Sequence, residues 1–249
     1  MKSSINVLAL VLLLLFTACG GGEKKAGSAE GMDTGAIEQL AQRGQEIFRD
    51  RHLGESGVAC MDCHTDYDED GKNDGRVRAG HSILGAHTRA QTWNGEFTGN
   101  ALRRTAAGAA KCAFQFQARG KNIETALSEQ EAAALMAFYA YISPADEPPM
   151  LTWTAVTYPG DPDFNADAFD KEIETIEKLR GDAMRGEKVF GMACAFCHEN
   201  GLGPAMRVVK RKVEHLPRAV RSGDETMPFF SRDKLTDQDI ADIKAFIAR

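Results

Sequence analysis

The sequence predicts an all-α protein made of two tandem helical domains. Along its 249 residues, the same order of a helix, a short cysteine–histidine run, a long loop and a closing helix occurs twice. The loops lack the alternating β-branched runs that are typical of strands. Several prolines fall between the two repeats and predict a linker over 144–165. The expected domains are therefore 36–143 and 166–249.

Composition excludes several classes of protein. The chain carries 30 Lys and Arg against 36 Asp and Glu, a formal net charge of -6. Binding to nucleic acid needs a basic surface that releases phosphate counterions, so we expect no nucleic-acid partner. Six cysteines are too few for a disulfide scaffold in a chain of this length.

The N-terminus predicts export rather than fold. Met1 and Lys2 give a positive start, and residues 5–16 form an apolar run that is too short to span a bilayer. The run ends in Phe-Thr-Ala-Cys at Cys19, which resembles a bacterial lipobox. The resemblance implies a lipoprotein signal peptide over 1–18 and a lipid on Cys19. An ordinary secretory signal is the alternative.

Residues 19–35 are rich in glycine and polar residues and have no periodicity, so they predict a flexible tether. Several acyl chains on one cysteine would hold a protein durably at a membrane. We therefore expect an exported protein that is lipid-anchored to a bacterial membrane, on the periplasmic or cell-surface side.

Each domain is expected to open and close with an amphipathic helix. In the first domain, residues 37–48 have helical apolar spacing, and Ser128 with Glu131 forms a capping box that starts the closing helix. In the second, Arg185–Phe190 (RGEKVF) repeats Arg43–Phe48 (RGQEIF), and the final helix starts at Thr236. The second core is so small that its folding would be only marginally stable without an additional cross-link, which a covalent cofactor would supply.

Two C-x-x-C-H motifs carry the chemistry. They consist of Cys60, Cys63 and His64, and of Cys194, Cys197 and His198. At this spacing two thiols can add to the two vinyl groups of one haem, and the adjacent histidine can bind the iron. A redox C-x-x-C needs no histidine, and a zinc site needs a shared cage of four ligands. The sequence therefore predicts two covalently attached c-type haems, with His64 and His198 as proximal ligands.

The C-terminal part resembles class I cytochrome c over about residues 182–249. A Gly-Leu-Gly-Pro run ends at Pro204, and a Met-Pro pair begins at Met227. The resemblance implies that Pro204 backs the proximal histidine and that Met227 is the distal ligand. His215 or Met206 are the alternatives. Histidine plus methionine raises the reduction potential and fills both axial positions, so such an iron transfers electrons rather than binding substrate.

The N-terminal half has no Met-Pro pair, but Cys112 is left over after the lipid and the haems are assigned. Together with the Gly-Lys pair at 120–121 and the segment 135–139, it resembles the sulfur-cycle dihaem cytochromes, thiosulfate dehydrogenase and the sulfur-oxidation cytochrome subunit. That resemblance implies Cys112 as the distal ligand of haem one. His81 and His87 are the alternatives, because neutral imidazole is a common iron ligand.

An acidic run follows the first motif. Asp66, Asp68, Asp70 and Asp74, with a glycine at the sixth position, match the front of a calcium loop. The twelfth position, where a bidentate glutamate is expected, is Val77. Two interpretations stay open: a Ca²⁺ site completed by another segment, or a solvated acidic turn.

These features predict a membrane-anchored dihaem cytochrome that transfers electrons between a redox donor and an acceptor, neither identified by the sequence. A thiolate would lower the potential of haem one and direct electrons to haem two. The alternative function is a thiosulfate dehydrogenase-like oxidoreductase with haem one as its active site. A basic cluster, Arg207 with 210–212, is either a docking site for an acidic redox partner or a solvated face.

Overall fold

A computed structural model describes residues 34–64, 74–89, 91–92, 97–98, 107–143, 164–224 and 226–249. The described chain is helical apart from a short ladder of β1 (Gln91–Thr92) and β2 (Phe97–Thr98), which the sequence did not predict. The predicted all-α class is confirmed. The signal peptide, nearly all of the tether and linker residues 144–163 lie outside the described residues.

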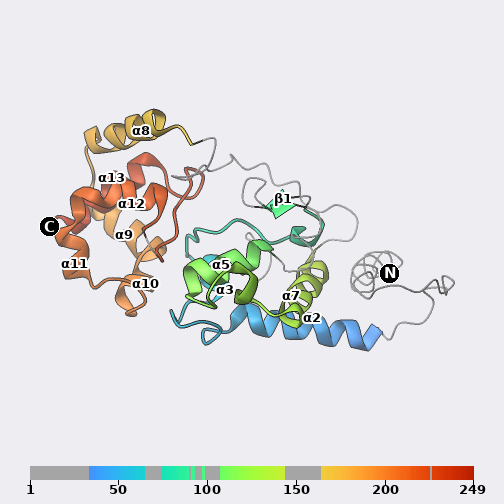
Figure 1. Ribbon diagram of the computed structural model, residues 1–249. Coiled ribbons are helices and arrows are strands. Elements are labelled where there is room, and N and C mark those ends of the chain that lie inside the picture. The colour runs from blue at the N-terminus through green and yellow to red at the C-terminus, as the bar shows by residue number, and fades with distance from the viewer. Residues whose placement is uncertain are drawn as a thin grey trace.

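The helices form two groups, which Figure 1 shows in blue to yellow-green and in yellow to red. The N-terminal group contains α2 (Thr34–Arg49), α3 (Cys60–Cys63), η1 (Ala86–Thr88), α5 (Ala107–Gln117), α6 (Ile123–Ala126) and α7 (Glu129–Ile142). The predicted capping box at the start of α7 is confirmed. The Ser128 hydroxyl accepts from the Glu131 N–H, and the Glu131 carboxylate accepts from the Ser128 N–H at 2.9 Å.

The C-terminal group contains α8 (Ala166–Lys178), α9 (Ala183–Ala193), α10 (Ala195–Glu199), α11 (Met206–Arg211), η2 (Val213–His215), α12 (Leu216–Ser222) and α13 (Asp237–Ile247). Its closing helix starts as predicted, because Thr236 and Asp239 also form a capping box. None of the helices described here is long and apolar enough to cross a membrane.

The internal repeat corresponds to two equivalent helix crossings, α2 on α7 and α9 on α13. At each crossing a glycine lets the backbones approach closely. A Cβ on Gly44 would overlap the carbonyl of Ala134, and a Cβ on Gly186 would overlap the carbonyl of Asp242. The repeated Arg-Gly pair therefore marks the contact point of each helix pair.

An aromatic pair lies beside each crossing. The Phe48 and Phe138 ring centroids are 5.5 Å apart, and so are those of Phe190 and Phe246. Tilted pairs at this distance stabilise a core beyond the burial of their area. Each pair belongs to a separate hydrophobic core, one in each half of the chain.

The two groups of helices are packed against each other through the segment that follows the first motif. Ala79 is buried in the C-terminal core, with 6% of its surface exposed. The N–H of Val77 donates to the carbonyl of Met192 in α9 at 3.0 Å. The segment 77–79, which precedes η1 in the chain, thus contacts the C-terminal group directly.

Candidate functional site

Both C-x-x-C-H motifs are wound as one helical turn. In α3 the His64 N–H donates to the carbonyl of Cys60 at 2.9 Å, and at the start of α10 the His198 N–H donates to that of Cys194 at 3.1 Å. Residues three apart on a helix lie on the same face, so each turn presents its two thiols together. The local backbone therefore brings together the three side chains that haem attachment requires.

The four motif cysteines are unbridged; Cys194 is buried, and Cys60, Cys63 and Cys197 are half-buried. None of the five cysteines that the structure describes forms a disulfide. Burial raises the pKa of the Cys60 thiol to about 11 and that of Cys194 to about 12. The motif sulfurs are therefore not committed to disulfides, and each motif keeps the two thiols that attachment of a cofactor through two thioether bonds requires.

Each proximal histidine is held by a backbone carbonyl. His64 Nδ1 donates to the His81 carbonyl at 2.6 Å, and His198 Nδ1 donates to the Pro204 carbonyl at 2.9 Å. A proton on Nδ1 leaves the lone pair of the neutral ring on Nε2, which makes Nε2 the nitrogen that can bind iron. The Pro204 carbonyl thus supports the His198 ring, as the resemblance implied, and the His81 carbonyl supports the His64 ring in the same way.

A glycine precedes each of these carbonyls and packs on the histidine ring. A Cβ on Gly80 would overlap the His64 ring, and a Cβ on Gly203 would lie 3.2 Å from the His198 ring. The role of Gly80 was not predicted from the sequence. The segment between the motif and this glycine is much longer in the first domain than in the second, because it contains the acidic run. The usable signal was a Gly-x pair in each loop, at unequal distances from the motif.

Cys112 lies in α5 and shares a buried region with the first motif. Burial and, to a smaller extent, the nearby Cys60 raise the pKa of the Cys112 thiol to about 12. Burial likewise raises the pKa of the Cys63 thiol, and the nearby Cys112 acts in the same direction. Tyr139 belongs to the same region, since burial and these sulfurs raise its pKa. The fold therefore brings the leftover cysteine close to the first attachment site.

The two candidate histidines occupy different places. His81 supplies the carbonyl behind His64, so its backbone lies on the proximal side. The His81 imidazole lies near Asp233 of the second domain. Burial tends to raise the pKa of the Asp233 carboxyl, but a hydrogen bond from Ser231 and the nearby His81 imidazole lower it. The carbonyl of His81 thus lies next to the His64 ring, and the His81 ring lies near Asp233.

His87 fits a ligand role better. It lies in η1, which packs on α7, and burial lowers the pKa of its imidazole. Its Nδ1 is buried without a hydrogen-bond partner among the described residues. A buried neutral imidazole with an unsatisfied nitrogen is costly unless a ligand uses it.

Met227 lies in a tight turn of the second domain. Its N–H donates to the Asp224 carbonyl at 2.8 Å, and its carbonyl accepts from the Asp224 N–H at 3.2 Å. The side chains of Met227 and Met206 are half-buried against the C-terminal core, whereas His215 is exposed. The turn therefore fixes a thioether at the edge of the core.

The calcium-like loop is only partly described. Asp66, Asp68 and Asp70 lie outside the described residues. Asp74 accepts two hydrogen bonds from Arg78, at 2.6 and 3.0 Å, and this pairing lowers the pKa of its carboxyl to about 2. The fourth predicted calcium ligand is thus already the partner of an arginine.

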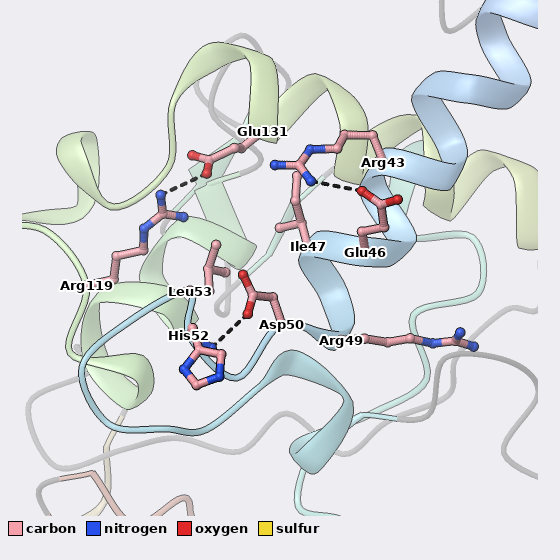
Figure 2. A pocket seen from close by; sticks show the side chains of 9 residues that line it. All are labelled: Arg43, Glu46, Ile47, Arg49, Asp50, His52, Leu53, Arg119 and Glu131. Atoms are coloured by element: carbon pink, nitrogen blue, oxygen red, sulfur yellow. Dashed lines mark hydrogen bonds and ion pairs between the residues drawn. The ribbon is translucent and has the colours of Figure 1, made fainter.

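A surface hollow of about 580 Å³ lies between the end of α2, the residues that follow it, and Arg119 and Glu131; none of the motif residues lines it (Figure 2). Most of the side chains that line it are charged, with both signs present; the lining residues are Arg43, Glu46, Ile47, Arg49, Asp50, His52, Leu53, Arg119 and Glu131. None of the predicted haem ligands belongs to it. Within the described ranges, no group of three or more His, Cys, Asp or Glu side chains is arranged to hold a metal ion directly.

Comparison with known proteins agrees with this geometry. Residues 181–247 match the family "Cytochrome C oxidase, cbb3-type, subunit III". Cytochrome c6 of Cyanidioschyzon merolae (strain NIES-3377 / 10D) is 35% identical over 77 residues, which span 26% of this chain and 72% of that protein. No solved structure matches the chain significantly.

The fold, the attachment motif and these relatives define an electron-transfer protein that carries c-type haem. The chain belongs to the cytochrome c family.

Proposed function

We propose that the protein is a membrane-anchored dihaem cytochrome that passes electrons between two redox proteins, with one haem in each domain. The observation that carries this proposal is the repeated attachment geometry. Each domain has a one-turn motif with a histidine whose Nδ1 donates to a carbonyl that follows a packed glycine. The family match covers the second domain, and the first domain reproduces the same arrangement.

The residues of the second domain fit one haem. Cys194 and Cys197 would hold it covalently, and the iron it carries alternates between Fe²⁺ and Fe³⁺. His198 would present Nε2 to the iron, because the Pro204 carbonyl holds Nδ1. Met227 would supply the distal thioether. Methionine ligation would favour a high potential.

In the first domain Cys60, Cys63 and His64 would hold the second haem. We propose Cys112 as its distal ligand, because the fold buries this sulfur near both attachment cysteines. His87 is the remaining alternative, and His81 is set aside because its backbone backs the proximal ring. Thiolate ligation would give this haem the lower potential, so electrons would pass to the second domain.

The proposal is tested by removing one attachment site at a time. The double variant Cys60→Ala/Cys63→Ala should retain one c-type haem per chain in the pyridine haemochrome assay, and so should Cys194→Ala/Cys197→Ala. The single variant Cys112→Ala, which leaves both motifs intact, should retain two. Complete retention of haem in either double variant would contradict attachment at that motif.

Cys112 also favours a second candidate function, a thiosulfate dehydrogenase-like enzyme. A thiolate-ligated iron in the first domain would then be the active site, and the second haem would receive the electrons. Incubation of the holoprotein with thiosulfate and a ferric electron acceptor distinguishes the two functions. Turnover that is lost in Cys112→Ala supports the enzyme, whereas absence of turnover in the native protein supports a carrier.

Anchoring and partner choice complete the proposal. Lipidation of Cys19 would hold the exported protein at the membrane, and Cys19→Ser should release it into the soluble fraction. The basic side chains Arg207, Lys210, Arg211 and Lys212 are all exposed. They would attract an acidic redox partner, so Lys210→Glu/Arg211→Glu should slow electron transfer to that partner at low salt.

A further inference from the structure

The two attachment motifs meet across the domain boundary at Phe196, the residue before Cys197. Two guanidinium groups of the first domain lie over its ring, that of Arg76 at 4.0 Å from the centroid and that of Arg51 at 4.8 Å. Guanidinium groups at this distance are attracted by the ring quadrupole. An aromatic side chain of the second motif is thus clamped by cations from the other domain.

Both arginines are anchored on the first motif. Asp62, the residue before Cys63, accepts two hydrogen bonds from Arg51, each at 2.7 Å. Arg76 lies 3.8 Å from the same carboxylate and donates to the Asp62 carbonyl at 3.4 Å. The Asp62 side chain is 1% exposed and also accepts from the Ala59 N–H. A buried carboxylate is stable only with such partners, so Asp62 fixes the positions of both arginines.

Contacts on both sides of this clamp keep the domains together. The Val77 N–H donates to the Met192 carbonyl at 3.0 Å, and Ala79 is buried in the C-terminal core. Gly57 lies close enough to Leu202 that a Cβ there would come within 3.1 Å of its side chain. The clamp therefore lies inside a packed interface.

The clamp brings the thiol-bearing edges of the two sites near each other. Arg51 and Arg76, which lie over the Phe196 ring, both pair with the Asp62 carboxylate. Cys63 and Cys197 directly follow Asp62 and Phe196 in the sequence. The side of each site that carries these thioether bonds would thus face the other domain.

We infer that Phe196, clamped by Arg51 and Arg76 on Asp62, is a positioning residue that fixes the thioether edges of the two haems for direct electron transfer. In that step one electron leaves the iron of the first domain, which goes from Fe²⁺ to Fe³⁺, and reduces the iron of the second from Fe³⁺ to Fe²⁺. No bond or proton changes place. This inference rests on the proposed dihaem function.

The test compares Phe196→Leu with Phe169→Leu in the full-length holoprotein. Phe169 is the matched control, because its ring also lies under an arginine, Arg218 at 5.2 Å, but within one domain. After flash photoreduction, interhaem equilibration should slow by roughly ten-fold or more in Phe196→Leu, since electron transfer depends steeply on geometry. Phe169→Leu should equilibrate like the native protein, and Phe196→Trp, which keeps a ring, should retain most of the rate.

Two further measurements separate positioning from general damage. The individual haem potentials should be unchanged in Phe196→Leu, and small-angle scattering should show the native radius of gyration, because the Val77–Met192 hydrogen bond and the burial of Ala79 still hold the domains together. Two haems per chain with a native equilibration rate in Phe196→Leu would overturn the inference alone. A single haem per native chain would overturn the proposed function and this inference together.

Discussion

The backbone of Gly186 in α9 lies directly against the backbone of Asp242 in α13, with no room for a side chain between them. The equivalent contact in the first domain joins Gly44 and Ala134. This close crossing sets the distance between the two helices that frame each attachment site.

Replacing the crossing glycine should therefore destabilise the second domain. We expect Gly186→Ala to lower the free energy of unfolding by about 1–3 kcal/mol, because the new methyl group forces the helices apart. Gly191→Ala in the same helix is the control, since nothing lies within 4 Å of a Cβ there. It should stabilise by about 0.5–1 kcal/mol through helix propensity. Denaturant unfolding measures both, and equal effects would contradict the crossing.

Asp242 makes the stability of the second domain pH-dependent. Burial tends to raise the pKa of its carboxyl, but hydrogen bonds from Arg185, the Asp182 N–H and Gln238 outweigh it and lower the pKa below 3.8. A carboxyl with a lowered folded-state pKa contributes stability above its unfolded pKa and loses it as pH falls through the folded pKa. Asp242→Asn should therefore cost about 1–3 kcal/mol near neutral pH.

This cost should shrink as the native carboxyl is protonated below about pH 4. Thermal unfolding at a series of pH values measures the difference. Asp170→Asn is the control, because its ion pair with Arg218 is exposed and should contribute little. A difference between Asp242→Asn and the native protein that stays constant down to pH 2 would contradict this assignment.

Met227 should determine the potential of the second haem. Methionine ligation raises the potential, and axial ligands tune haems over about 0.8 V. We expect Met227→His to lower the potential of this haem on the order of 100 mV and to abolish the methionine–iron charge-transfer band of the ferric spectrum. Met206→Leu should change neither. Persistence of the band in Met227→His would identify another sulfur ligand.

The distal ligand of the first haem is decided by a pair of variants. Cys112→Ala should change the low-spin EPR signal of one haem and raise its potential, because a thiolate ligand lowers it. His87→Ala should leave that signal unchanged. The reverse pattern would assign the ligand to His87, whose buried Nδ1 has no hydrogen-bond partner among the described residues.

Local chemistry made several elements predictable. The capping boxes at Ser128 and Thr236 are short patterns with a fixed structural meaning, and the structure confirms both. The repeat of Arg43–Phe48 at Arg185–Phe190 indicated equivalent helices, and the structure adds the close crossing at each glycine. The two attachment turns follow from the spacing of the motif alone. In each case, the residues that interact lie within five positions of one another or repeat along the chain.

What escaped prediction depends on contacts between distant segments. The hydrogen bond from His64 to the His81 carbonyl spans 17 positions, and no fixed spacing announces it. The clamp on Phe196 joins residues of two domains, and a surface arginine looks the same in sequence whether or not it crosses an interface. The short ladder of β1 and β2 is too small to leave a periodic pattern.

The number of haems per chain tests the central claim most directly. Intact-mass spectrometry of the mature protein, produced with its full export and haem-attachment machinery, measures covalent haem without relying on colour or activity. The account predicts a mass increase of two haems over the polypeptide. An increase of only one haem would show that the first domain is not an attachment site, and that the repeated geometry does not carry a repeated cofactor.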